Sequence, residues 1–218
     1  MAVEFERVRS RLYSAILADA LDAVGCTKQA MHPGIRPLDD EVILCGRART
    51  GLYLEVHHLE PNENPYELEI QLVDGLCPGE VAALATGNSR RIVPWGELLS
   101  TAATARQAAG CVTDGLTRDV ARIRHMGFAV FSGGVGPLDS RGRGKIVAID
   151  VPVEIGGVMV TRGDLVFGDV DGVVVVPRAV EKEVLQRAFA KVDAEDTTRA
   201  ELLAGATLAD VFARHGIL

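Results

Sequence analysis

Trp95 to Asp119 reads W-G-E-L-L-S-T-A-A-T-A-R-Q-A-A-G-C-V-T-D-G-L-T-R-D, and our interpretation of both the fold and the function starts from this segment. An alanine-rich stretch from Leu98 to Ala109 favours a helix, and a turn, a short strand and a second turn are expected from Gly110 to Gly115. Twenty residues separate Glu97 from Arg118. A helix that folds back onto the strand would bring Glu97 beside Arg118 and Asp119. Two acids and one permanent cation would suit a divalent metal and a 2-oxo acid.

Length and charge narrow the class of protein. A chain of 218 residues allows one well-packed core, so we expect a single domain over residues 1–218. The net charge of −7 argues against a surface that binds nucleic acid. Glu4 and Glu6 lie where a secretory signal needs a basic region, and the apolar runs are far shorter than the roughly 20 residues that cross a bilayer. We therefore expect a soluble, cytoplasmic protein.

Cysteines and histidines give no metal-binding pattern. The four cysteines are widely spaced, without a C-x-x-C pair or paired histidines: Cys26, Cys45, Cys77 and Cys111. Each lies in an apolar stretch, so we interpret them as buried thiols in a reducing compartment. His57-His58 is flanked by acids, but neighbouring residues on a strand point to opposite faces. We interpret this pair as part of a solvated or substrate-facing loop.

The remaining pattern predicts a mixed α/β domain. Apolar spacings of three and four from Phe5 to Val24 predict one helix that ends at Gly25. Two strands are expected at 42–44 and 52–54, hinged near Gly46, and Gly133 to Pro137 is expected to be irregular. Further helices are predicted at 66–73, 120–126, 178–203 and 208–215, and further strands at 81–85, 128–131, 146–151, 158–160 and 173–176. Strands outnumber helices in the middle, which indicates no regular strand–helix alternation.

Two glycine-rich stretches lack the features of a phosphate site. Gly133 to Gly136 does not have the G-x-G-x-x-G spacing, and Gly144-Lys145 is followed by isoleucine where a P-loop needs Ser or Thr. Arg141 to Lys145 could present cations to an anionic substrate, although an exposed turn is the commoner structure for such a run. No G-x-S-x-G motif is present and no serine has a nearby histidine, so we do not expect nucleophilic serine chemistry.

Arg118-Asp119 allows two interpretations. The pair is expected to open the helix at 120–126, and an acid in the first turn of a helix commonly serves only as a partner of the helix dipole. A planar guanidinium beside a carboxylate could also hold a 2-oxo acid on a metal. The carboxylate would bind the cation, and the arginine would bind the substrate oxygen on which negative charge develops.

Three motifs resemble those of the RraA-like family: G-E-L-L at 96–99, D-G-L-T-R-D at 114–119 and G-D-V-D-G-V-V-V-V-P at 168–177. The resemblance covers most of the chain, from about Leu21 to the C-terminal helix. The family holds the class II 4-hydroxy-4-methyl-2-oxoglutarate/4-carboxy-4-hydroxy-2-oxoadipate aldolases and the regulator of ribonuclease E activity A. It implies a swivelling β/β/α-type domain with flanking N- and C-terminal helices. It also implies a homotrimer or homohexamer with active sites between subunits.

The resemblance also implies roles for individual residues. Asp119 would be the only direct protein ligand of Mg²⁺ or Mn²⁺, and Arg118 would polarise the C2 oxygen of the pyruvyl group. The amides of Leu98 and Leu99, which follow Gly96 at a helix N-terminus, would bind the substrate carboxylate.

Two further acids are implied in proton transfer. Glu97 would hold the water that shuttles the proton; the aldolases carry aspartate here, so this chain has a longer side chain at that position. A neighbouring subunit would contribute a C-terminal glutamate, for which Glu195 is the best match and Glu183 the alternative.

The implied reaction is cleavage of a 4-hydroxy-2-oxo acid to pyruvate, with oxaloacetate decarboxylation as a side activity. The alternative is a non-catalytic regulator that binds a ribonuclease. A methyltransferase would be a third class, but the glycine-rich stretches give it no support. No motif in 57–66 or 88–91 indicates which 2-oxo acid is the substrate.

Overall fold

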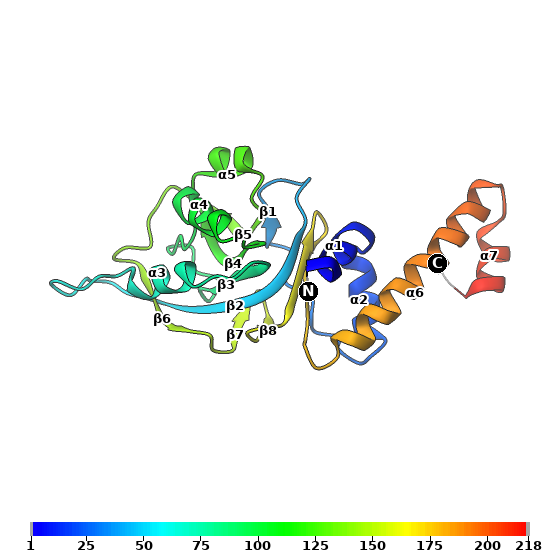
Figure 1. Cartoon of the computed structure of the whole chain (residues 1–218), viewed down its shortest axis with the longest axis horizontal. Helices are drawn as coiled ribbons and strands as arrows, with labels where there is room; N and C mark the ends of the chain where they lie inside the picture. The colour runs from blue at the N-terminus through cyan, green and yellow to red at the C-terminus, as the bar shows by residue number, and fades with distance from the viewer. Residues whose placement is uncertain (1, 217–218) are drawn as a thin grey trace.

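The computed structural model of the chain describes residues 2–216, and a mixed eight-stranded sheet forms its centre (Figure 1). Seven strands follow the order β1-β5-β4-β3-β2-β9-β10, and β6 also pairs with β2. The strands are β1 (Arg36–Pro37), β2 (Leu44–Glu55), β3 (Glu80–Ala85), β4 (Gly110–Thr117), β5 (Val130–Val135), β6 (Gly144–Ile149), β9 (Leu165–Asp169) and β10 (Gly172–Val176). A separate hairpin consists of β7 (Val153–Ile155) and β8 (Val158–Val160).

Half of the sheet alternates regularly with helices. β2, β3, β4 and β5 are parallel neighbours in chain order, and the connections carry α3 (Glu67–Asp74), α4 (Glu97–Ala105) and α5 (Val120–Met126). The mixed α/β class is confirmed, but the expectation of no strand–helix alternation was wrong for this half. Every residue of β4 is buried, as is typical of strands covered on both faces, and such strands lack the period-two pattern that would reveal their place in a sheet.

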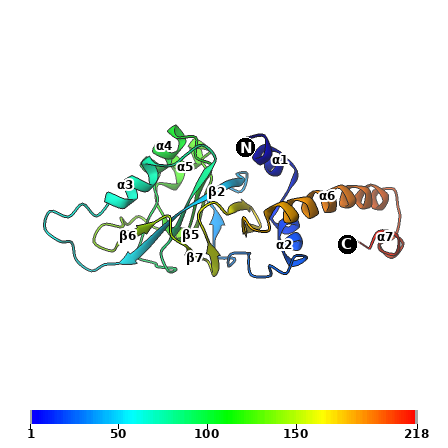
Figure 2. The same cartoon turned by 60° about the horizontal axis from the view of Figure 1, so that its bottom comes forward.

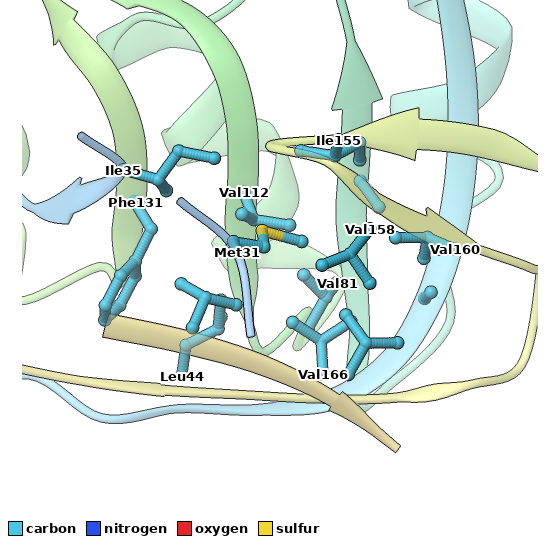
Figure 3. Packing of buried hydrophobic residues seen from close by; sticks show 14 of the residues in the cluster. Met31, Ile35, Leu44, Val81, Val112, Phe131, Ile155, Val158, Val160 and Val166 are labelled. Carbon is cyan, nitrogen blue, oxygen red and sulfur yellow. The ribbon is translucent and has the colours of Figure 1, made fainter. Parts of the chain in front are cut away.

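The two faces of these strands have different cores. Val81 and Ala83 point to one side, where the β7–β8 hairpin packs, and Figure 3 shows this cluster from close by. Ala82 and Leu84 point to the other side, toward the apolar faces of α3, α4 and α5. Burying both faces of one strand accounts for its continuous apolar sequence and fixes α4 against the end of β4.

The four terminal helices are α1 (Ala2–Arg11), α2 (Ser14–Asp22), α6 (Glu181–Leu203) and α7 (Leu208–His215). Three of them, α1, α2 and α6, pack against β9 and β10, and α7 packs against α6. Figures 1 and 2 both show α6 extending away from the sheet, at the end of the molecule opposite α4. None of the helices described, from α1 to α7, combines the length and apolar character that crossing a bilayer requires.

The single N-terminal helix expected from Phe5 to Val24 is wrong, because the chain breaks between α1 and α2. Tyr13 is extended, with φ −139° and ψ 163°. The amide and hydroxyl of Ser14 both donate to the carboxylate of Asp169, each at 2.7 Å. This contact with a distant turn starts the second helix, and no local spacing of apolar residues could have indicated it.

Three expected strand boundaries were also wrong. The two strands expected at 42–44 and 52–54 are replaced by one strand, β2. Gly46 is not a hinge between them. A Cβ at this position would lie 2.8 Å from Cβ of Ala109, so the glycine permits close packing. The expected turn at Gly115 belongs to the continuous strand β4. Gly134 and Val135, expected to be irregular, pair with β4 as part of β5.

The cysteine interpretation holds for two residues. Cys45 and Cys111 are buried, and burial raises the pKa of both thiols. Cys26 is half-buried, and Cys77 is exposed, which contradicts the expectation that all four are buried. Cys77 lies in the turn before β3, where the chain leaves the core.

Candidate active site

A cleft of about 190 Å³ lies where the N-terminus of α4 meets the end of β4. Six residues singled out from the sequence line it: Gly96, Glu97, Leu98, Leu99, Arg118 and Asp119. The rest of the lining consists of Tyr66, Glu69, Val93, Trp95, Asp139 and Ser140. The fold therefore brings together the two ends of the segment from Trp95 to Asp119.

Trp95 anchors one end of this segment. Its ring is fully buried and stacks on Phe128 with centroids 6.2 Å apart. Its indole Nε1 donates to Oγ of Ser100 at 2.9 Å, and that hydroxyl donates to the carbonyl of Gly96 at 3.0 Å. The Trp95 carbonyl accepts from the amide of Arg118 at 3.2 Å. These bonds fix the first turn of α4 to the last residues of β4.

Gly96 allows the two ends to touch. A Cβ at this position would lie 2.9 Å from Oδ2 of Asp119 and 3.2 Å from Cγ of Arg118. Both distances are shorter than ordinary van der Waals contacts, so any larger residue would displace the Arg-Asp pair. Glycine at 96 is thus a requirement of the site's geometry.

The sequence predicted that Asp119 lies in the first turn of a helix. This prediction was wrong, because α5 begins at Val120. Asp119 has left-handed backbone angles, φ 60° and ψ 30°, and its side chain makes no capping bond to α5. Its Oδ2 accepts instead from the amide of Glu97 at 3.2 Å. The carboxylate therefore faces the positive end of α4 and the cleft.

Asp119 can accept a cation as an additional partner. Its other oxygen, Oδ1, has no hydrogen-bond partner among residues 2–216, and its side chain is 41% exposed. Over the same residues, no group of three or more His, Cys, Asp or Glu is arranged to hold a metal. Mg²⁺ is commonly bound through one or two carboxylates with water and substrate oxygens completing the shell. A single accessible carboxylate fits that ligand set.

Arg118 is held on one side only. Its Nη1 donates to Oδ2 of Asp139 at 2.9 Å and to the carbonyl of Leu138 at 3.2 Å. Its Nε lies 3.6 Å from Oδ2 of Asp119. Within the described part of the chain, Nη2 has no hydrogen-bond partner. One arm of the guanidinium is therefore available to an anionic ligand in the cleft.

The start of α4 offers further donors. Gly96 has no side chain with which to cap the helix, so the first amides of α4, at Leu98 and Leu99, are available to an anion. Oε1 of Glu97 accepts from the hydroxyl of Thr101 at 3.0 Å, which fixes this acid at the rim of the cleft. An anion bound here would contact backbone amides and a guanidinium beside a carboxylate.

Three titratable lining residues were missed by the sequence reasoning: Tyr66, Glu69 and Asp139. Glu69 is buried and accepts a hydrogen bond from the Tyr53 hydroxyl. Burial outweighs that bond and raises the pKa of Glu69 to about 7, and the nearby Asp139 adds to the rise. One sequence feature could have revealed Glu69 as a site residue. This glutamate lies on the apolar face of α3, three residues before the buried Leu72.

Glu195 does not reach the cleft of its own chain. It lies on α6, where its carboxylate accepts from the Tyr13 hydroxyl and lies 3.8 Å from Nζ of Lys191. Burial and this bond raise the pKa of Tyr13 to about 12. The alternative, Glu183, is exposed and pairs with Arg187 at 2.8 Å. Either glutamate would have to enter a cleft from a second subunit.

A family model and several known proteins are similar to this chain. A family model described as "RraA-like: Aldolase/RraA" matches residues 14–175. A protein of Halalkalibacterium halodurans, named "Putative 4-hydroxy-4-methyl-2-oxoglutarate aldolase", is 34% identical over 184 residues, 84% of this chain and 80% of that protein. An uncharacterized protein of Pseudomonas syringae superposes with a TM-score of 0.83 at 26% identity over 97% of both chains. RraAS2 of Streptomyces coelicolor, described as an unusual member of the RNase ES inhibitor RraA protein family, superposes with a TM-score of 0.79 at 29% identity, over 90% of this chain and 96% of that one.

Proposed function

The chain belongs to the RraA-like family, and we propose that it is a divalent-metal-dependent lyase that cleaves a 4-hydroxy-2-oxo acid to pyruvate. One observation carries the proposal. Within residues 2–216, Oδ1 of Asp119 and Nη2 of Arg118 have no partner, and both lie in the same cleft, beside the amides that open α4. The similarity to a protein named as an aldolase supports the same reaction.

Substrate binding would use the donors of the cleft. The amides of Leu98 and Leu99 would receive the C1 carboxylate, because a helix N-terminus favours an anion. Nη2 of Arg118 would donate to the C2 oxygen. Asp119 would hold Mg²⁺ or Mn²⁺, which when bound supplies a Lewis acid for the C1 and C2 oxygens.

Cleavage breaks the bond between C3 and C4 of the substrate. The C4 hydroxyl loses its proton and becomes a carbonyl, and the electron pair of the broken bond passes through C3 to the C2 oxygen. Arg118 would stabilise the negative charge that develops there. Glu97, at the rim of the cleft, would hold the water that accepts the proton of the C4 hydroxyl and delivers a proton to C3 of the enolate, which completes pyruvate. Oxaloacetate would lose carbon dioxide by the same electron flow, which is the side activity that we propose.

The site would be completed by a second copy of the chain, in a homotrimer or homohexamer. Glu195, or Glu183 as the alternative, would be supplied by the neighbour, since neither lines its own cleft. The surface of α6 and α7 carries large exposed apolar side chains, namely Leu203, Leu208 and Phe212. Exposed apolar groups of this kind commonly mark a protein interface.

A panel of 4-hydroxy-2-oxo acids and oxaloacetate, assayed for pyruvate release with and without Mg²⁺, tests the function. We expect metal-dependent release from at least one of them. A second candidate, a regulator that binds a ribonuclease, is favoured by the similarity to RraAS2. Absence of pyruvate from the whole panel, together with inhibition of a ribonuclease by the protein, would favour the second candidate.

A further inference from the structure

Asp139 is the central acid of a hydrogen-bonded chain that leads to Arg118. Its Oδ2 accepts from Nη1 of Arg118 at 2.9 Å. Its Oδ1 accepts from the hydroxyl of Tyr66 and from the amide of Arg141, both at 2.8 Å. Both oxygens are thus engaged, and the carboxylate is fixed in one orientation.

These contacts keep Asp139 ionised. Its partial burial opposes ionisation, but the bonds from the Arg141 amide, Tyr66 and Arg118 outweigh this effect and lower the pKa of Asp139. Burial and the hydrogen bond to Asp139 raise the pKa of Tyr66 to about 12. Around neutral pH the chain therefore consists of a phenol, a carboxylate and a guanidinium.

A second carboxylate lies close to the same guanidinium. Nε of Arg118 is 3.6 Å from Oδ2 of Asp119, which is longer than a hydrogen bond. Without Asp139, the guanidinium would be free to turn further toward Asp119 and to replace this ion pair by a direct hydrogen bond. Such a bond would neutralise the carboxylate proposed to bind the metal and would occupy the donors proposed to bind the substrate.

We infer that Asp139, itself held by Tyr66, is the positioning residue for Arg118: it binds Nη1, holds Nε of Arg118 at 3.6 Å from Asp119, beyond hydrogen-bond distance, and leaves Nη2 for a 2-oxo acid. This inference rests on the proposed function of the cleft. It also assigns a role to the loop that precedes α3. This loop places Tyr66 in the cleft and is tied to β6 by an ion pair between Glu63 and Lys145.

The test is the binding of oxalate, which has the adjacent oxygens of a 2-oxo acid and cannot be cleaved. Titration calorimetry in the presence of Mg²⁺ would give its dissociation constant for the wild-type protein and for Asp139→Asn, which keeps the shape of the side chain. We expect binding about 10–100-fold weaker in the variant, the range typical of partners that orient a metal site from outside. Tyr66→Phe removes only one bond to Asp139 and should weaken binding in the same direction to a smaller extent.

Two controls separate positioning from a general structural effect. Asp74→Asn makes the same change in another Asp-Arg pair, with Arg106, outside the cleft, and should leave oxalate binding unchanged. In an Arg118→Ala background, Asp139→Asn should have no further effect, because its influence passes through Arg118. An undiminished effect in that background, or wild-type affinity in Asp139→Asn alone, would overturn the inference.

The oxalate-binding test does not depend on whether the protein cleaves a substrate. Suppose that the protein binds oxalate with Mg²⁺ and that Asp139→Asn weakens this binding as expected, but that no pyruvate is released from any substrate. The positioning role is then supported and the lyase reaction is contradicted. If pyruvate is released and Asp139→Asn behaves as wild type in both assays, the lyase reaction stands and the positioning role falls. If the wild-type protein does not bind oxalate at all, the positioning role falls as well.

Discussion

The amide of Glu97 donates a hydrogen bond of 3.2 Å to Oδ2 of Asp119. The first residue of α4 thus holds an acid that lies 22 positions later in the chain. Because Asp119 is in the left-handed region, its carboxylate points away from the helix that follows it. This contact and the backbone bond from Arg118 to Trp95 join the two ends of the segment and set the geometry of the cleft.

Arg118→Lys should lose most of kcat although the charge remains. Lysine is a point charge and cannot bind Asp139 through one nitrogen while offering another to the substrate. Steady-state kinetics of pyruvate release would measure the loss. Arg106→Lys, in the pair with Asp74 outside the cleft, is the matched control and should behave as wild type. Near-normal turnover in Arg118→Lys would assign Arg118 a structural role only.

Glu97→Gln should slow proton transfer by ~10²–10⁴-fold, the usual contribution of a general acid or base. Glu97→Asp should retain activity, because it keeps the acid and introduces the aspartate that the family resemblance implies for the aldolases. The backbone amide that binds Asp119 is present in both variants, so the carboxylate of Asp119 should stay in place. Equal rates for wild type and Glu97→Gln would remove Glu97 from the mechanism.

The sequence predicted that Glu97, Arg118 and Asp119 lie together, but it did not reveal the other two acids of the cleft, Glu69 and Asp139. The segment from Trp95 to Asp119 indicated that Glu97, Arg118 and Asp119 belong together, and the structure places them in one cleft. Asp139 could not be found in this way. It enters the site through a loop after β5, and only the tertiary fold places it beside Arg118.

For the fold too, the sequence predicted only those elements that have a local pattern. Long apolar runs predicted β10 and the strand at 81–85, because burial leaves a clear pattern. The break at Tyr13 and the pairing of Gly134 depend on partners far away in the chain, Asp169 and β4. Contacts of this kind leave no local signal in the sequence.

Glu69 should make stability depend on pH. Its pKa rises from 4.5 in the unfolded chain to about 7 in the folded protein, so the folded state holds the proton more tightly. The stability that this group contributes is complete below about pH 4.5 and is lost as the pH rises through about 7. One pKa unit corresponds to about 1.4 kcal/mol, so ionising buried Glu69 costs on the order of 3 kcal/mol.

Glu69→Gln removes this titration and keeps the shape. Denaturant unfolding at pH 5 and pH 8 should show a smaller loss of stability with rising pH in Glu69→Gln than in wild type. The exposed Glu67→Gln on the same helix is the control and should follow wild type. Identical pH profiles for Glu69→Gln and wild type would mean that Glu69 is ionised in the folded protein.

Subunit mixing tests whether the cleft is shared. Subunits with Asp119→Ala and subunits with Glu195→Ala should each be inactive, and mixing them after dissociation should restore activity above either parent. A mixed ring contains some clefts with both residues intact. Tyr13→Phe, which loses the same bond within the chain but keeps the carboxylate of Glu195, should remain active. Mixtures no more active than their parents would count against Glu195 and direct the test to Glu183.

The most direct measurement is the rate of pyruvate release from oxaloacetate by wild type and by Asp119→Asn, with Mg²⁺ and with a chelator. Asparagine tolerates the left-handed backbone of position 119, so the fold should survive, and circular dichroism would verify this. We expect release by the wild-type protein with Mg²⁺, and only the uncatalysed rate with the chelator or in Asp119→Asn under either condition. Full wild-type activity in the chelator, or in a folded Asp119→Asn, would contradict the account.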